Sequence, residues 1–202
     1  MARVRTAVLI SGRGSNLGSL IEAARAPDYP AEIVLVISNK ADAGGLATAQ
    51  RAGIYTKVVP HKEFASREDF DAAIDGALRE IDVSLVCEAG FMRIHSEWFV
   101  KRWEGRILNI HPSLLPSFPG VRVHEQALAA GVKISGCTVH FLTAELDSGP
   151  IIAQASVPVL PDDTAETLAA RVLEQEHELY PEALKLVAEG KVKLENGRAV
   201  FV

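Results

Sequence analysis

The stretch that decides the fold stands near the start of the chain, where Val4-Arg5-Thr6-Ala7-Val8-Leu9-Ile10 runs directly into Ser11-Gly12-Arg13-Gly14-Ser15-Asn16. The first run predicts a buried β-strand. It is not a signal peptide, because the apolar run is too short and no cleavage site follows it. The second run combines glycines with small polar residues, and a helical pattern follows at residues 16–25. A strand, a glycine-rich turn and a helix in this order are typical of an α/β fold.

The same alternation continues through the first half of the chain. Short apolar runs predict strands at residues 33–38, 55–59, 83–87 and 106–110, with helical patterns between them at residues 45–52, 67–80 and 97–103. Alternation of this kind predicts a Rossmann-like, mostly parallel sheet with helices on both faces.

The C-terminal half changes character. Residues 134–142 and 150–157 alternate like a pair of antiparallel strands. The polar connection at 143–149 is long for a hairpin, which makes it a candidate functional loop. Thr164 is expected to cap a long helix, and Asn196-Gly197 predicts a hairpin near the end. The sequence therefore predicts an antiparallel extension of the sheet, within a single domain of 202 residues.

Composition excludes several classes of protein. A net charge of −5 disfavours a nucleic-acid-binding protein, and no stretch reaches the roughly 20 apolar residues of a membrane helix. Cys87 and Cys137 lie in apolar, strand-like contexts, so we expect free core thiols, which suit a cytoplasmic protein. No His, Cys or Asp set has the spacing of a zinc site, and no metal is expected.

The glycine loop is expected to bind a phosphate group and not a dinucleotide. Its glycines at 12, 14 and 18 miss the G-x-G-x-x-G spacing by one position. The second strand also ends without the acidic residue that would bind an adenosine ribose. Backbone N–H groups at a helix start favour a phosphate monoester, held by Gly14, Ser15 and Asn16. The alternative is a tight turn in which Ser15 only caps the helix.

Asn109 and His111 follow the run Ile107-Leu108, at the predicted carboxyl end of a parallel strand, where ligands bind in open α/β sheets. Residues two apart on a strand point to the same side. An amide and an imidazole directed together suit acyl transfer, because Asn can donate to a developing oxyanion while His donates or moves a proton. Asp147 on the 143–149 loop is a candidate carboxylate partner for His111, or else ordinary turn chemistry.

Other polar residues have simpler interpretations. His61 and His95 have no partner at metal-binding spacing, and His124 near a helix start is a candidate to line the cleft. His140 lies within a predicted strand and is expected to be structural. The charged run around Glu176 is by default a solvated helix face.

Four separated motifs together resemble one family. They are Ile10-Ser11-Gly12-x-Gly14-Ser15-Asn16-Leu17, Ala89-Gly90-Phe91-Met92-Arg93-Ile94, Asn109-Ile110-His111-Pro112-Ser113-Leu114-Leu115-Pro116 and Glu145-Leu146-Asp147-x-Gly149-Pro150-Ile151-Ile152, in that order. Over essentially its whole length the chain resembles the phosphoribosylglycinamide formyltransferases, folate-dependent transferases of purine biosynthesis and one-carbon metabolism.

The resemblance implies a reaction and its catalytic residues. The amine of glycinamide ribonucleotide would attack the formyl carbon of the co-substrate 10-formyltetrahydrofolate. By resemblance, Asn109 and His111 stabilise the oxyanion, and Asp147 assists proton transfer and orients His111.

The resemblance also implies the binding residues. Gly14, Ser15 and Asn16 would hold the ribonucleotide phosphate, and Glu176 the ribose hydroxyls. The residues expected around folate are Arg67 near the glutamate tail and, at the pterin, Met92, Arg93, Ile94, Ala144 and Asp147. Residues 1–202 would form a single formyltransferase domain, with phosphate and ribonucleotide binding in the N-terminal half and the folate-binding loop and long helix in the C-terminal half. A cytoplasmic monomer or homodimer is expected.

The chain departs from the family pattern at a few positions. His95 stands where an apolar residue is expected, so the pterin pocket should differ there. Arg122 and Leu173 stand where polar residues of other kinds are expected, and Arg13 replaces a frequent Asn.

Three alternatives to the transferase are considered. A formyltetrahydrofolate hydrolase carries a regulatory domain before the first strand. Methionyl-tRNA formyltransferase carries a further C-terminal domain and needs a basic surface for tRNA. A non-catalytic ribonucleotide-binding module would retain the phosphate loop but has no use for Asn109, His111 and Asp147 together.

Overall fold

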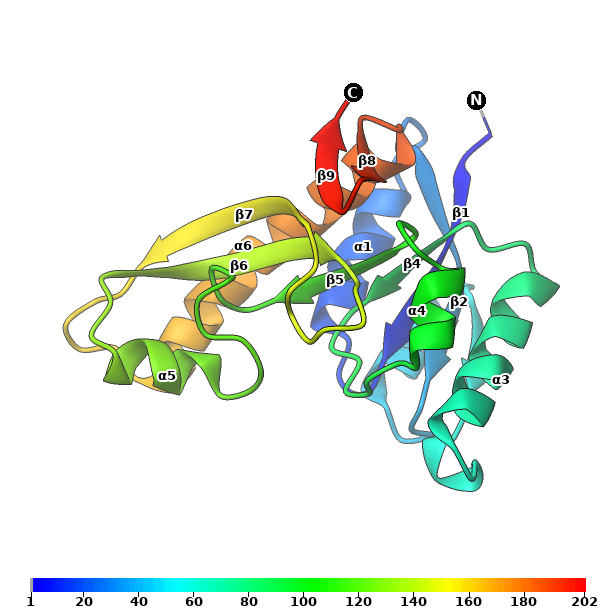
Figure 1. Ribbon diagram of the computed structural model, residues 1–202, viewed down its shortest axis with the longest axis horizontal. Helices are drawn as coiled ribbons and strands as arrows, with labels where there is room; N and C mark the ends of the chain where they lie inside the picture. Colours follow the sequence, from blue (N-terminus) through cyan, green and yellow to red (C-terminus); the bar gives the residue numbers. More distant parts are fainter. Residues whose placement is uncertain (1) are drawn as a thin grey trace.

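The computed structural model describes residues 2–202 and shows a seven-stranded sheet covered by helices on both faces (Figure 1). Its strands are β1 (Val4–Ile10), β2 (Ala31–Ser38), β3 (Tyr55–Val58), β4 (Leu85–Glu88), β5 (Ile107–His111), β6 (Ile134–Phe141) and β7 (Ile151–Pro158). Its helices are α1 (Ser15–Ala24), α2 (Gly44–Arg51), the short 3-10 helix η1 (His61–Glu63), α3 (Arg67–Glu80), α4 (Glu97–Arg102), α5 (Val123–Ala129) and α6 (Ala165–Ala188). The elements predicted from the sequence are confirmed, with boundaries that differ by two residues at most.

The order of strands in the sheet is β3-β2-β1-β4-β5-β6-β7. The pairs from β3 to β5 are parallel, and β6 and β7 add antiparallel pairs at one side. This is the expected Rossmann-like sheet with its antiparallel extension. The chain reverses its direction of travel across the sheet between β1 and β4, and ligands of open α/β sheets bind at such a switch point.

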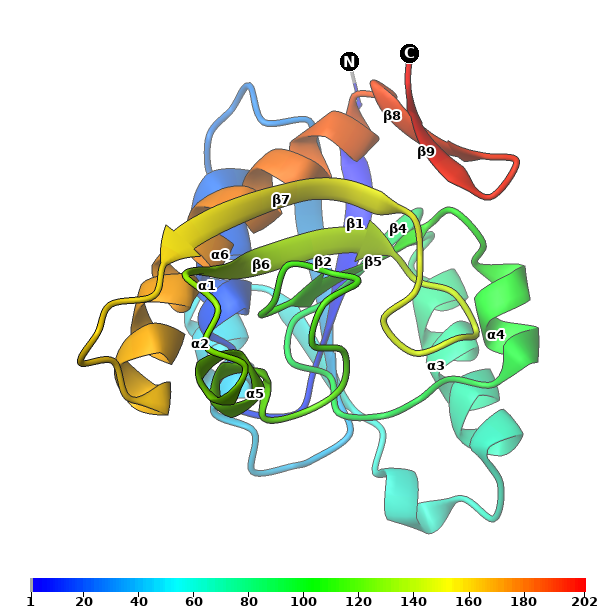
Figure 2. The same ribbon diagram turned by 60° about the vertical axis from the view of Figure 1, so that its left-hand side comes forward.

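Helical periodicity explains how the two faces of the sheet are covered. In α3, Phe70, Ile74 and Leu78 recur every four residues, and all three are buried against the sheet. α4 packs on the same face, whereas α1, α2 and α6 cover the opposite face (Figure 2). Apolar layers therefore cover both faces of the sheet, and its strand ends carry the polar residues of the site.

The long helix α6 begins where the sequence predicts. The Thr164 hydroxyl accepts from the Thr167 N–H at 3.3 Å, and the Thr167 hydroxyl accepts from the Thr164 N–H at 2.9 Å, which forms a capping box. Further along, the hydroxyl of buried Tyr180 is shared between two carbonyl oxygens, of Glu88 at 2.9 Å and of Leu108 at 2.8 Å. α6 is thereby attached to β4 and β5 at the centre of the sheet.

The cysteines and the C-terminal hairpin also agree with the sequence analysis. Cys87 and Cys137 are free and buried. A separate hairpin pairs β8 (Val192–Glu195) with β9 (Arg198–Phe201), and both Asn196 and Gly197 in its turn have positive φ. Within residues 2–202, no helix has the length and apolar character to cross a bilayer.

Candidate active site

The glycine-rich stretch of residues 11–16, which we call the phosphate loop, leads into α1 at the switch point. Gly14 is the N-cap residue with φ of 72°, and Ser15 is the first helical residue, so the alternative in which Ser15 caps the helix is wrong. A side chain at Gly14 would be strained by its φ, and its Cβ would lie 3.0 Å from the Cα of Gly45. The loop borders a cavity of about 240 Å³ that Lys40 and Met92 also line. The unpaired N–H groups at this helix start suit an anion.

Asn16 and Glu176 meet at the base of this loop although 160 residues separate them. The Asn16 amide nitrogen donates to Oε2 of Glu176 at 2.8 Å, and both residues are buried. Glu176 therefore does not belong to a solvated helix face, and burial raises the pKa of its carboxyl. Oδ1 of Asn16 is enclosed and has no hydrogen-bond partner among the described residues. An unsatisfied buried acceptor beside a carboxylate suits a ligand with hydroxyl groups.

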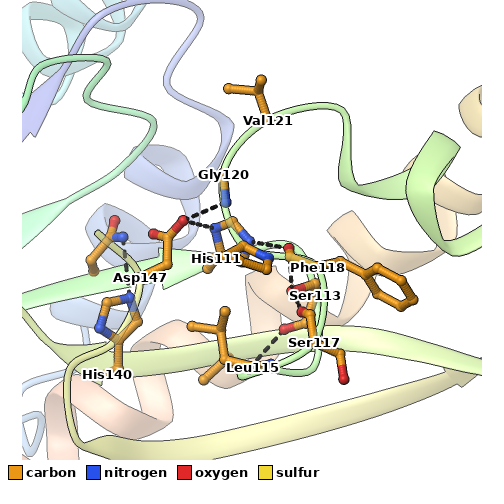
Figure 3. Close-up of polar contacts among 12 residues, drawn as sticks. His111, Ser113, Leu115, Ser117, Phe118, Gly120, Val121, His140 and Asp147 are labelled. Atoms are coloured by element: carbon orange, nitrogen blue, oxygen red, sulfur yellow. Dashed lines mark hydrogen bonds and ion pairs between the residues drawn. The ribbon is translucent and has the colours of Figure 1, made fainter. Parts of the chain in front are cut away.

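Asn109 and His111 lie on β5, two residues apart, at the carboxyl edge of the sheet. Figure 3 shows His111 between Asp147 and the Phe118 carbonyl. Nδ1 of His111 lies 3.5 Å from Oδ2 of Asp147, and both side chains are buried. This distance is long for a hydrogen bond but close for an ion pair. The 143–149 loop thus brings the candidate carboxylate to the candidate imidazole.

Backbone groups determine which nitrogen of His111 carries hydrogen. Nε2 of His111 lies 3.0 Å from the carbonyl oxygen of Phe118, which can only accept, so Nε2 is the donor. The Ser113 hydroxyl also donates to the Phe118 carbonyl at 3.0 Å. Nδ1 is therefore the ring nitrogen that makes no backbone hydrogen bond, and it faces Asp147.

His140 orients the amide of Asn109. Nδ1 of His140 donates to the Phe141 carbonyl at 2.9 Å, which leaves Nε2 as an acceptor for the Asn109 amide nitrogen at 3.3 Å. Burial lowers the pKa of His140 and favours this neutral ring. The sequence predicted that His140 lies in a strand, but its contact with Asn109 was missed. The β5–β6 register that aligns the two residues is not visible in the sequence. The second amide hydrogen of Asn109 remains free to donate.

Asp147 sits on a closely fitted loop. Its φ is 50°, and its Oδ2 accepts from the Gly120 N–H at 2.7 Å. Two residues later, Gly149 lies so close to β6 that an added Cβ would overlap the Phe141 carbonyl and lie 3.0 Å from Nδ1 of His140. The loop can reach His111 because residue 149 has no side chain.

His124, the candidate to line the cleft, lies in the first turn of α5. It is half-buried, and its Nδ1 is enclosed without a hydrogen-bond partner among residues 2–202. Burial lowers the pKa of His124 first, and the nearby His111 lowers it further. Both effects favour the neutral form of His124, which places no second positive charge beside His111.

Of the residues expected around folate, all except Asp147 are exposed. Met92, Arg93 and Ile94 follow β4, Ala144 lies on the loop between β6 and β7, and Arg67 begins α3. The Met92 N–H donates to Oγ of Ser11 at 2.8 Å, which attaches this segment to the phosphate loop. No group of three His, Cys, Asp or Glu side chains in residues 2–202 is arranged to hold a metal ion.

The site thus combines a glycine-rich loop at the switch point with an amide, an imidazole and a carboxylate two strands away, a set of groups that suits an α/β enzyme of acyl transfer. The sequence profile described as formyl transferase matches residues 4–184. The chain belongs to this family, and within it to the phosphoribosylglycinamide formyltransferases. The resemblance read from the four motifs is confirmed.

Individual relatives agree with this placement. A phosphoribosylglycinamide formyltransferase of Haemophilus influenzae is 44% identical, over 96% of this chain and 92% of its own. The crystal structure of glycinamide ribonucleotide transformylase 1 from Symbiobacterium toebii is 48% identical with a TM-score of 0.96, covering 99% of this chain and 94% of its own. A trifunctional purine biosynthetic protein of Gallus gallus is 57% identical over 95% of this chain. This chain spans about a fifth of the length of such trifunctional relatives, 19% in this case.

Proposed function

We propose that this chain transfers the formyl group of 10-formyltetrahydrofolate to the amine of glycinamide ribonucleotide, a step of de novo purine biosynthesis. The observation that carries the proposal is the contact of His111 with Asp147 beside the oriented amide of Asn109. A bond forms between the amine nitrogen and the formyl carbon, and the bond from that carbon to the folate nitrogen breaks. The proton lost by the amine replaces the formyl group on the folate.

The ribonucleotide is assigned to the phosphate loop. Gly14, Ser15 and Asn16 would hold the phosphate with backbone N–H groups and short polar side chains. Glu176 would accept hydrogen bonds from the ribose hydroxyls, and the unsatisfied Oδ1 of Asn16 supplies a further acceptor nearby. The substrate amine would then point along the edge of the sheet toward β5.

Asn109, His111 and Asp147 would stabilise the negative charge that develops on the formyl oxygen and move the proton during transfer. The free hydrogen of the Asn109 amide would donate to the oxyanion on the formyl group. A proton on Nδ1 of His111 makes an imidazolium that Asp147 stabilises, and this charge also favours the oxyanion. Because the contact with Asp147 is 3.5 Å and not a tight hydrogen bond, the Nδ1–H of the imidazolium would remain available to donate to the reacting oxygen. Asp147 would relay the proton of the amine, through water, to the leaving nitrogen.

The formyl donor is assigned to groups around this edge of the sheet. Met92, Arg93 and Ile94 on one side, and Ala144 and Asp147 on the other, would enclose the pterin. Arg67, a cation at the start of α3, would contact the glutamate tail. In this assignment residues 1–202 act as one formyltransferase domain, with the ribonucleotide held by the N-terminal half and the donor loop and long helix supplied by the C-terminal half.

The cellular setting follows from the same assignment. Two buried free thiols suit the reducing cytoplasm, where we place the activity, and the partners are the two small substrates. Neither nucleic acid nor a membrane is among the proposed partners. Size-exclusion chromatography with light scattering would distinguish the monomer from the homodimer.

An absorbance assay tests the proposal. Purified protein is mixed with 10-formyltetrahydrofolate, with and without glycinamide ribonucleotide, and formation of tetrahydrofolate is followed. Turnover that requires the ribonucleotide is the expected result. Turnover without it would indicate a formyltetrahydrofolate hydrolase, and no turnover in either mixture would indicate a ribonucleotide-binding module.

A further inference from the structure

Three ionisable side chains are buried together next to the catalytic strand, outside the groups assigned above. His95 lies near the end of the segment between β4 and α4, and 5% of its surface is exposed. Its Nδ1 lies 2.6 Å from Oδ1 of Asp71 on α3, and its Nε2 lies 2.8 Å from Oε1 of Glu88, the last residue of β4. Both carboxylates are also buried. We refer to Asp71, His95 and Glu88 as the His95 cluster.

His95 in this cluster is a cation. Carboxylate oxygens accept hydrogen bonds, so each ring nitrogen carries a hydrogen. Burial alone would lower the pKa of His95, but the hydrogen bonds to Asp71 and Glu88 outweigh it and raise the pKa to about 9. The ring also stacks between Phe91 and Phe99, with centroid distances of 5.3 Å and 4.3 Å. Apolar side chains would fill this space at a lower desolvation cost, so stability alone is a weak reason for the cluster.

The cluster begins one strand away from the catalytic amide. Glu88 on β4 is in register with Asn109 on β5, and Asn109 is in register with His140 on β6. Registered residues on neighbouring strands project from the same face of the sheet, with strands about 4.8 Å apart. Glu88 therefore stands beside Asn109 on the face that carries the reaction.

The segment between β4 and α4, residues 89–96, is attached at both ends. Near its start, the Ser11 N–H donates to the Gly90 carbonyl at 3.2 Å, and Oγ of Ser11 accepts from the Met92 N–H. At its end, His95 is held by its two carboxylates, and the Ser96 N–H donates to Oδ2 of Asp71 at 2.5 Å. Only Arg93 and Ile94 lie between these attachments, so the cluster limits how far they can move.

We propose that the His95 cluster is a positioning device for the formyl donor, in which Asp71 and Glu88 act through His95 to hold Met92, Arg93 and Ile94 in their binding conformation. The inference rests on the proposed function, which assigns those three residues to the donor. A segment already ordered loses less conformational entropy when a ligand binds. Breaking the cluster should therefore weaken binding of the donor. Binding of the ribonucleotide should be unchanged, because the hydrogen bond between Asn16 and Glu176 does not involve the cluster.

The cluster also sets a pH dependence with a definite sign. The charged groups that face His95 are Asp71 from α3 and Glu88 from β4, while α4 contributes the Phe99 ring. The next carboxylate on α3, Asp75, is occupied by Arg79 and Arg102. Because the pKa of His95 is raised from 6.5 to about 9, its ion pairs contribute their full stabilisation below pH 6.5, and the cluster is lost as the pH rises through about 9. Donor affinity should fall over the same range.

The test compares two neighbouring buried carboxylates on α3. Asp71→Asn removes a carboxylate from the cluster. Asp75→Asn, one turn along, is a matched control because Asp75 is also buried but contacts Arg102 and Trp103 at the end of α4. Calorimetry would measure the Kd of tetrahydrofolate and of glycinamide ribonucleotide, and the midpoint of thermal unfolding would be recorded for both variants.

The expected result is a Kd for tetrahydrofolate raised roughly tenfold by Asp71→Asn and unchanged by Asp75→Asn, with unchanged ribonucleotide affinity. Imidazole NMR should report His95 protonated until about pH 9 in the wild type and to a lower pH in Glu88→Gln. Equal effects of both α3 variants on Kd, or no effect of either, would overturn the inference while the proposed function stands. A wild-type protein that binds no tetrahydrofolate would refute the proposed function and this inference together.

Discussion

Gly149→Ala gives the sharpest test of the catalytic geometry. The substitution adds a single methyl group, at a residue that is not assigned to either substrate. The added carbon would overlap the carbonyl oxygen of Phe141. Restoring an ordinary contact distance requires the loop to move by more than about 1 Å, and such a displacement of a catalytic group can cost roughly a hundredfold in rate. Asp147, two residues away, would leave its 3.5 Å contact with His111. We therefore expect kcat to fall about a hundredfold.

The assay separates a local effect from general damage. Transfer rates are measured at saturating concentrations of both substrates, and calorimetry measures the affinity for glycinamide ribonucleotide, whose binding groups lie apart from the loop. Ser148→Ala is the matched control, since Ser148 is exposed and its hydroxyl makes only a 3.4 Å contact with Glu145. Wild-type kcat in Gly149→Ala would refute the argument that close approach of this loop sets the position of Asp147. A parallel loss of ribonucleotide affinity would show that the damage is not confined to the loop.

Three further predictions concern the assigned residues. Asp147→Asn should lower turnover by orders of magnitude while calorimetric binding of the ribonucleotide survives; unchanged turnover would remove Asp147 from the mechanism. Ser15→Ala combined with Asn16→Ala should mainly weaken ribonucleotide binding, because both side chains stand at the helix start that suits an anion, and equal calorimetric affinity would place the phosphate elsewhere. Arg67→Ala should raise the KM for a polyglutamylated donor by a few fold and leave the monoglutamate unaffected, since exposed charge contacts are weak; equal KM changes for both donors would contradict a contact with the tail.

Most of the fold could be predicted because its signals are local. Apolar runs separated by helical patterns located every strand of the main sheet, and Thr164 marked the start of α6. The strand ends were less predictable because they depend on distant partners. β5 continues to His111 since that residue pairs with Thr138 on β6, a contact that local periodicity does not contain.

The site divides in the same way. Local sequence indicated the phosphate loop and the pair Asn109 and His111. Family resemblance assigned Asn16 and Glu176 to the same ribonucleotide, but the hydrogen bond between them was not predicted. The Phe118 carbonyl that selects the donor nitrogen of His111 was missed, because a backbone group has no residue-type signature. The buried contacts of His95 with Asp71 and Glu88 were also not predicted, although the unusual residue at position 95 was noticed.

The attachment of α6 to the sheet has a consequence for how the two halves of the site vary. Glu176 and Tyr180 are one helical turn apart, so they lie on the same side of α6. Glu176 accepts a hydrogen bond from Asn16 in the phosphate loop. The Tyr180 hydroxyl contacts backbone carbonyls of β4 and β5, next to Asn109. A one-residue insertion between them would turn the second by about 100° relative to the first and break one of the two attachments. The four-residue interval from Glu176 to Tyr180 thus sets the spacing between the proposed ribonucleotide site and the end of β5. Substitutions on the exposed face of α6 should be tolerated far better than insertions or deletions between these two residues.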